Sequence, residues 1–253
     1  MIKSLQLFGV AMLLLAHAVA CTARPLTVAV ASSVSYAFHD LAAEFSKMTG
    51  IEVDGVSGSS GKLAVQIMNG APYDVFLAAD MEDPKMLYLD GLAMDEPMVY
   101  AKGLLVLWTM SPLDIGKGIR VLNDPEVLKV AVANPDVAPY GREAMRALEY
   151  FRLLAAVKPK LVYGESISQA SQYIYSGSAD IGFTAKSVVL APEISGKGKW
   201  IELPEKSYHP IIHGAVILGN GFHTNFVASR RFLQFLTSPA AREILEKYGF
   251  LLP

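Results

Sequence analysis

The sequence has a single cysteine, Cys21, which excludes an intramolecular disulfide. Charged residues make up only 18% of the chain, the formal net charge is −2, and no basic stripe runs along the sequence. Nucleic acid is therefore not an expected partner, because proteins that bind it concentrate Lys and Arg on one surface. Hydrophobic residues make up 52% of the chain, which predicts a folded protein with a sizeable core. The length of 253 residues exceeds the usual size of one compact domain.

Long hydrophobic runs are also lacking, and none is long enough for a transmembrane helix. The apolar run over residues 5–15 follows Lys3 and precedes the small residues Ala18-Val19-Ala20, which is typical of a secretory signal peptide over residues 1–20. We therefore expect an exported, periplasmic protein. Cys21 directly follows the cleavage site, so it is either a lipid-anchored first residue or an incidental thiol.

Apolar runs and helical spacings alternate along the rest of the chain. Strands are predicted over residues 26–31, 51–56, 74–78, 104–109, 129–133, 161–163, 181–184 and 211–218. Helices are predicted over residues 34–48, 63–70, 142–154, 166–175, 225–236 and 239–248. This order favours an α/β fold with parallel sheets flanked by helices.

Two short polar patches lie where a predicted strand gives way to a predicted helix. They are Ala31-Ser32-Ser33 and Ser57-Gly58-Ser59-Ser60-Gly61. Ser33 and Ser60 are suitable N-caps, which needs no ligand. Both patches follow successive strands of one parallel sheet, however, so they would face one crevice. Hydroxyls and N–H groups without carboxylates or arginines indicate a site for a fully ionised oxyanion.

Other chemistry is poorly supported by the sequence. Gly61-Lys62 is not a phosphate-binding P-loop, because Val56 replaces the first glycine and Leu63 the Mg²⁺-binding hydroxyl. The histidines are scattered, and His209 and His213 lie in a predicted strand region where a four-residue spacing does not make a metal pair. The acidic residues after the third strand, which are Asp80, Glu82 and Asp83, are interpreted as a solvated helix start.

The chain resembles the ModA family, the molybdate-binding proteins of molybdate ABC importers, over essentially its whole length after the signal segment. The segments that carry this resemblance in the first part of the chain are 26–33, Ser59-Ser60, 63–67, 70–76 and Ala79-Asp80. Those in the second part are Asn134-Pro135, Pro139-Tyr140-Gly141, 164–167, 179–183, Ala240-Ala241 and 247–250.

The resemblance implies a two-lobed periplasmic binding protein of type II, each lobe a mixed, mostly parallel sheet flanked by helices, with two crossovers. Lobe one would be residues 24–102 and 214–253, and lobe two residues 103–213. The implied ligand is molybdate or tungstate, with no cofactor and no metal beyond the oxyanion. The implied ligand-binding residues are the first-lobe hydroxyls with their N–H groups and two second-lobe N–H groups: Ser33, Ser60, Ser32, Tyr140 and Ile167.

One position departs from the family pattern. Many members supply a tyrosine hydroxyl where this chain has Ala185, followed by Lys186. We expect the phenol of Tyr140 to replace the missing donor, and we interpret Lys186 as a solvated lysine at a helix start.

The resemblance further implies a monomer that is not an enzyme and that delivers its ligand to an inner-membrane ABC permease. Two alternatives stay open at this point. One is a binding protein for another oxyanion, such as sulfate or phosphate. The other is an exported serine hydrolase using Ser33 or Ser60, although no histidine lies on either loop.

Overall fold

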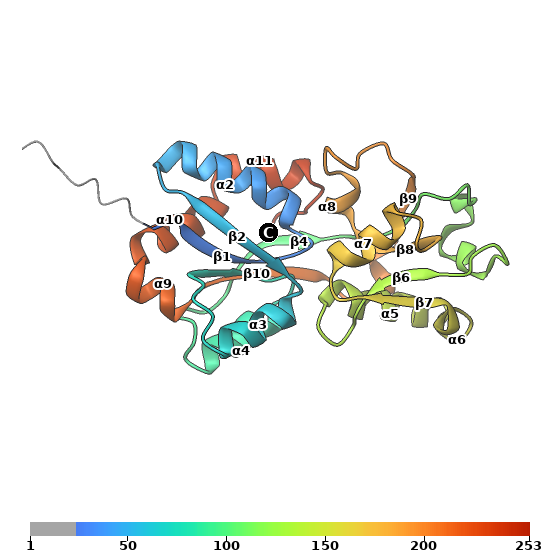
Figure 1. Cartoon of the computed structure of the whole chain (residues 1–253), viewed down its shortest axis with the longest axis horizontal. Coiled ribbons are helices and arrows are strands. Elements are labelled where there is room, and N and C mark those ends of the chain that lie inside the picture. Colours follow the sequence, from blue (N-terminus) through green and yellow to red (C-terminus); the bar gives the residue numbers. More distant parts are fainter. Residues whose placement is uncertain (1–23) are drawn as a thin grey trace, which may run out of the picture.

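A computed structural model describes residues 24–253, which form two lobes side by side along the long axis of the molecule (Figure 1). The predicted signal segment and Cys21 lie outside the described residues. Within residues 24–253, no helix combines the length and the apolar character that crossing a bilayer requires.

The first lobe is built on a five-stranded sheet with the order β2-β1-β3-β10-β4. Its strands are β1 (Leu26–Ala31), β2 (Val53–Gly58), β3 (Val75–Leu77), β4 (Met98–Gly103) and β10 (Ile211–Ile217). Strand β1 pairs in parallel with β2 and β3, whereas β10 pairs antiparallel with β3 and β4. The carboxyl ends of β1, β2 and β3 therefore meet at one edge of the sheet.

The second lobe repeats this arrangement in a sheet with the order β7-β6-β8-β5-β9. Its strands are β5 (Leu105–Thr109), β6 (Val130–Ala133), β7 (Leu161–Gly164), β8 (Ile181–Ala185) and β9 (Lys199–Glu202). Strand β6 is parallel to β7 and β8, and β5 is antiparallel to β8 and β9. The predicted two-lobed α/β class with mixed sheets is confirmed, although antiparallel pairs are as frequent as parallel ones.

Helices cover both faces of each sheet (Figure 1). Those of the first lobe are α2 (Ser35–Thr49), α3 (Ser60–Met68), α4 (Glu82–Leu89), α9 (Gly219–Thr224), α10 (Phe226–Leu236) and α11 (Pro239–Lys247). Those of the second lobe are α5 (Pro139–Tyr150), α6 (Leu154–Val157), α7 (Ile167–Tyr175) and α8 (Lys186–Val189). Short 3₁₀ segments are η1 (Ile115–Asn123), η2 (Lys158–Lys160) and η3 (Glu205–Ser207).

Helix α2 shows how closely the apolar spacing determines local structure. Its buried residues Phe38, Leu41 and Phe45 are spaced three and four positions apart, so they lie on one face of the helix. Gly50 ends the helix in the left-handed conformation, with φ of 72°, which only glycine adopts without strain. The rings of Phe45 and Phe232 then pack edge to face, with centroids 5.1 Å apart, and join α2 to α10.

The chain passes between the lobes where β4 leads through Leu104 into β5, and it returns into β10. The first crossover was predicted near Lys102-Gly103, at the end of β4. The second was predicted near His213-Gly214, within β10, which already pairs with β4 from Ile211. The lobe boundaries at 102 and 213 stay a prediction.

A buried carboxylate ties the start of β1 to the third strand and to α9. Asp74 is fully buried and accepts hydrogen bonds from the Arg24 guanidinium, at 2.5 and 2.9 Å. It also accepts from the Thr27 amide at 2.9 Å and from the Asn220 side-chain amide at 2.9 Å. One anion thus satisfies donors from three parts of the first lobe.

We expect Asp74→Ala to lower the free energy of unfolding by about 2–4 kcal/mol, because two neutral donors lose their acceptor inside the protein. The ion pair with Arg24 is left out of this free energy, because the Arg24 side chain is 42% exposed and solvent screens the pair. Urea denaturation measures the effect, with Asp54→Ala, an exposed aspartate on β2, as control. Equal stability of the two variants would contradict this assignment.

Candidate functional site

A small cavity lies where the two lobes meet. It is lined by Ala31, Ser32, Ser33, Ser59, Ser60, Ala79, Ala138, Pro139, Tyr140 and Ile167. All five residues predicted as ligands from the sequence are among them. The volume is about 10 Å³, close to the smallest cavity that holds a water-sized group, so only a compact ligand suits this site without separation of the lobes.

Ser32 and Ser33 form the turn that follows β1. The sequence interpretation of Ser33 as an N-cap is wrong, because α2 begins at Ser35 with Val34 in the N-cap position and no side chain capping it. The Ser33 hydroxyl is buried and has no hydrogen-bond partner among the described residues. Since buried hydroxyls are nearly always paired, this hydroxyl is available to a ligand.

Ser59 and Ser60 follow β2 at the start of α3. The interpretation of Ser60 as an N-cap is wrong too, because Ser59 is the N-cap and Ser60 is the first residue of the helix. Ser60 Oγ accepts a hydrogen bond of 2.9 Å from the Ala79 amide, so its own proton is free to be donated into the cavity. Ser59 Oγ is buried and, within residues 24–253, has no partner. The sequence analysis did not select Ser59, although its place directly after a parallel strand was the same signal that selected Ser60.

The second lobe contributes the first turns of two helices. Tyr140 is the second residue of α5, after Pro139, and Ile167 is the first residue of α7. Backbone N–H groups in a first helical turn have no partner within the helix. The positive end of the helix dipole adds to this, so both helix starts suit an anion. Ser166 instead caps α7 by accepting from the Gln169 amide.

Tyr140 lines the cavity, and its phenol is buried. Its oxygen lies 3.4 Å from His213 Nε2. Burial raises the phenol pKa strongly, and the neighbouring Ser33 hydroxyl opposes that rise. Ser33 Oγ nevertheless makes no hydrogen bond of acceptable geometry to the phenol. The two hydroxyls are thus neighbours without being paired.

The departure at Ala185 leaves no polar side chain at that position. Ala185 is buried at the end of β8. Lys186 is not a solvated lysine as expected from the sequence, because its ammonium forms an ion pair of 2.5 Å with Glu202 and its side chain is only 21% exposed. Neither residue lines the cavity. The cavity lining therefore carries no charged side chain, and its polar side chains are neutral hydroxyls.

Direct contacts join the lobes around the cavity. The Gly61 amide donates to the Val137 carbonyl at 3.0 Å. The Ser187 hydroxyl donates to the Ser33 carbonyl at 2.5 Å. At the rim, Lys62 pairs with Glu165 at 2.8 Å. The structure is thus a closed arrangement of the lobes.

The acidic cluster after β3 takes part in this closure. Asp80 is buried and pairs at 2.8 Å with Arg142 of α5, so the interpretation of a solvated helix start is wrong for it. Asp83 lies behind this pair, and its Oδ2 is buried without a partner among the described residues. Burial and the neighbouring Asp80 charge raise the pKa of Asp83 to about 7.

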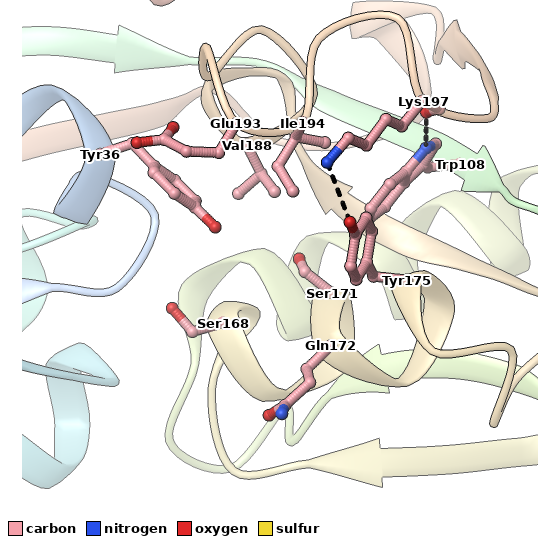
Figure 2. Close-up of a pocket in the computed structure, with 10 residues that line it drawn as sticks. All are labelled: Tyr36, Trp108, Ser168, Ser171, Gln172, Tyr175, Val188, Glu193, Ile194 and Lys197. Atoms are coloured by element: carbon pink, nitrogen blue, oxygen red, sulfur yellow. Dashed lines mark hydrogen bonds between the residues drawn. The ribbon is translucent and has the colours of Figure 1, made fainter.

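A larger cavity of about 380 Å³ lies elsewhere between Tyr36 of α2 and the second lobe (Figure 2). It contains none of the residues predicted as ligands. Figure 2 shows Tyr175 beside Trp108, with its hydroxyl hydrogen-bonded to Lys197 at 2.9 Å. Its polar groups are already paired or exposed, so this cavity lacks the unpartnered buried donors of the smaller one.

Comparison with known proteins gives one consistent result. The family model of the bacterial extracellular solute-binding proteins matches residues 26–251. The chain is 36% identical to the molybdate-binding protein ModA of Rhodobacter capsulatus over 94% of this chain and 93% of the relative. It is 37% identical to ModA of Azotobacter vinelandii over 92% of each chain. The solved structure of the Azotobacter vinelandii periplasmic molybdate-binding protein superposes with a TM-score of 0.84 at 33% identity, covering 90% of this chain and 99% of that one.

The raised pKa of Asp83 gives a prediction for the pH dependence of stability. Between the ordinary carboxyl pKa of about 3.9 and about 7, the folded protein holds a proton that the unfolded chain releases. This contribution to stability is therefore complete below about pH 4 and is lost as the pH rises through about 7.

We expect Asp83→Asn, which is neutral at every pH, to raise Tm by about 2–4 °C at pH 8, the shift that about 1 kcal/mol produces in a domain of this size. At pH 4.5 the variant and the original protein should unfold at nearly the same temperature. Thermal unfolding at both pH values measures this, with the exposed Asp54→Asn as control. A Tm difference that does not depend on pH would rule the interpretation out.

Proposed function

Because this chain belongs to the bacterial extracellular solute-binding proteins, and among them to the ModA family, we propose that it binds molybdate or tungstate in the small cavity between its lobes. The observation that carries this proposal is the pair of buried serine hydroxyls without partners, Ser33 and Ser59. An anion that accepts hydrogen bonds satisfies both at once.

The proposed donors come from both lobes. The first lobe offers the serine hydroxyls and the N–H groups of Ser33 and Ser60, and the second lobe offers the N–H groups of Tyr140 and Ile167 together with the Tyr140 phenol. Each hydrogen bond to a dianion contributes about 1.5–3 kcal/mol. Six or more such bonds support tight binding even after the cost of ordering and closure.

Selectivity follows from what the cavity lacks. Molybdate carries no proton at neutral pH, whereas hydrogen phosphate needs an acceptor for its proton, and no carboxylate lines the cavity. Sulfate satisfies the same donors as molybdate, so its rejection would rest on size, because its bonds to oxygen are shorter. The fixed positions of the donors around the cavity make it sensitive to that difference.

This arrangement does not support the alternative function of a serine hydrolase. His213 is the histidine behind the cavity, but Tyr140 stands in contact with it at 3.4 Å. Burial lowers the pKa of His213 to about 3, and neither ring nitrogen contacts a carboxylate within residues 24–253. A general base oriented by an acid is thus not assembled beside Ser33 or Ser60.

In the cell the protein would act as a periplasmic monomer that presents its closed, loaded form to the permease of an ABC importer. Ligand-driven closure of two lobes is a known way for such proteins to signal occupancy. A lipid anchor at Cys21 would hold it near that permease, and its absence would leave it free. No catalytic step is part of this role.

Calorimetric titration with molybdate, tungstate, sulfate and phosphate tests the proposal. We expect tight binding of the first two, toward the nanomolar range, and at least a hundredfold weaker binding of sulfate and phosphate, about 2.7 kcal/mol at 25 °C. Phosphate or sulfate binding as tightly as molybdate would overturn the assignment of the ligand. No binding of any of the four would overturn the site.

The contribution of single hydroxyls is tested by substitution. We expect Ser33→Ala and Ser60→Ala each to weaken molybdate binding about 10–100-fold, the loss of one charge-assisted hydrogen bond. Ser195→Ala, at an exposed serine of the second lobe, is the matched control and should leave the affinity unchanged. Full affinity in both cavity variants would show that the anion binds elsewhere.

A further inference from the structure

Three buried polar rings lie next to the cavity, and only one of them, Tyr140, is among the proposed donors to the anion. Tyr100 of β4 and Tyr140 of α5 are each 1% exposed, and His213 of β10 between them is fully buried. The Tyr100 hydroxyl lies 3.4 Å from His213 Nδ1, and the Tyr140 hydroxyl lies 3.4 Å from His213 Nε2. The three rings thus form a chain from the first lobe to the cavity.

The packing around His213 holds its ring in one orientation. Tyr100, Tyr140 and Phe250 all contact it edge to face, with ring centroids 5.8, 6.0 and 5.3 Å away. Gly103 adds to this, because a Cβ at that position would overlap the Tyr140 hydroxyl and approach His213 Nε2 to 2.8 Å. The contact between Tyr140 and His213 is therefore possible only because residue 103, at the crossover between the lobes, has no side chain.

Burial lowers the pKa of His213 to about 3, so its imidazole is neutral at physiological pH. A neutral imidazole has one N–H donor and one acceptor nitrogen. The hydrogen bonds that its neighbours make then decide which nitrogen carries the proton.

The contact with Tyr100 favours one of the two tautomers. Among the described residues its hydroxyl has no partner except His213 Nδ1. Tyr140 has a second outlet, because it lines the cavity and its proton can be donated to a ligand there, whereas Tyr100 does not line it. Donation from Tyr100 to Nδ1 therefore lets both hydroxyls donate, and it leaves the proton of the imidazole on Nε2. His213 Nε2–H then donates to the oxygen of Tyr140, and the phenol's own proton is free to point into the cavity.

We propose that His213 is a positioning residue for anion binding, which with Tyr100 directs the O–H of Tyr140 into the cavity as a hydrogen-bond donor. This rests on the proposed function, since the acceptor is the bound oxyanion. In the opposite tautomer Tyr140 would donate to His213 and turn its lone pairs toward the anion, which repels them. The tautomer of a residue outside the cavity lining thus decides whether the phenol attracts or repels the ligand.

The first arm of the test needs no ligand. Imidazole ¹⁵N NMR of the anion-free protein distinguishes the two neutral tautomers, and His213→Gln assigns the resonance. We expect the Nε2–H form in the original protein and a shift toward the Nδ1–H form in Tyr100→Phe. The Nδ1–H form in the original protein would overturn the proposal, whether or not molybdate binds.

The second arm measures molybdate affinity in a double-mutant cycle. We expect Tyr140→Phe to weaken binding about tenfold and Tyr100→Phe, which does not touch the cavity, about three- to tenfold. The double variant should bind no more weakly than Tyr140→Phe alone. Tyr248→Phe, which removes another mostly buried phenol that bonds Asp40, is the matched control and should bind normally.

The outcomes separate the two proposals. Additive losses from Tyr100→Phe and Tyr140→Phe would mean that Tyr100 acts only through general packing, and the relay would be overturned. If the original protein shows no affinity for molybdate, the proposed function fails, and the anion-directed role of His213 fails with it. An Nε2–H tautomer would in that case still show that the hydrogen-bond direction was assigned correctly.

Discussion

The site depends on one constraint, which is that closure of the lobes buries hydrogen-bond donors that the protein itself does not satisfy. Ser33 Oγ and Ser59 Oγ are buried without partners among the described residues, and two first-turn helix amides face them from the second lobe. Each buried donor left unsatisfied costs about 1–3 kcal/mol. The closed state is therefore unfavourable around an empty cavity and favourable around an acceptor-only anion, which couples binding to closure without any further device.

The contacts between the lobes are consistent with this coupling. The pair of Lys62 and Glu165 is 45% and 69% exposed, so it adds little to the stability of the closed form. The better-buried pair of Arg142 and Asp80 is opposed by the desolvation of the carboxylate, which raises its pKa despite the arginine. Such contacts align the lobes, and in the proposed function the bound anion would supply the free-energy difference between open and closed forms.

Sequence reasoning found those features that depend on neighbours along the chain. The strand over 26–31 and the helix over 34–48 were predicted because apolar spacing acts locally. Ser33 and Ser60 were selected because they follow adjacent parallel strands. The burial of Asp80 was missed because its partner, Arg142, lies 62 residues away on the other lobe. The role proposed for His213 was hidden for the same reason, since Tyr100 and Tyr140 come from separate elements.

Neutral hydroxyls favour a fully deprotonated anion over a protonated one only if their oxygens do not also accept a hydrogen bond from the protonated ligand. A serine or tyrosine oxygen is both donor and acceptor, so a cavity of free hydroxyls would tolerate a protonated anion as well. At Ser60 the Ala79 amide already donates to the oxygen from behind, which occupies one of its two lone pairs and leaves the hydroxyl proton for the cavity. In the tautomer proposed for His213, its Nε2–H would donate to the Tyr140 oxygen in the same way. Ser33 and Ser59 have no such backing donor, so their hydroxyls can either donate to an anion or accept from a protonated one. The preference for a fully deprotonated ligand therefore rests on the groups that can only donate, which are the backbone N–H groups of both lobes, and on the hydroxyls whose oxygens already accept a hydrogen bond.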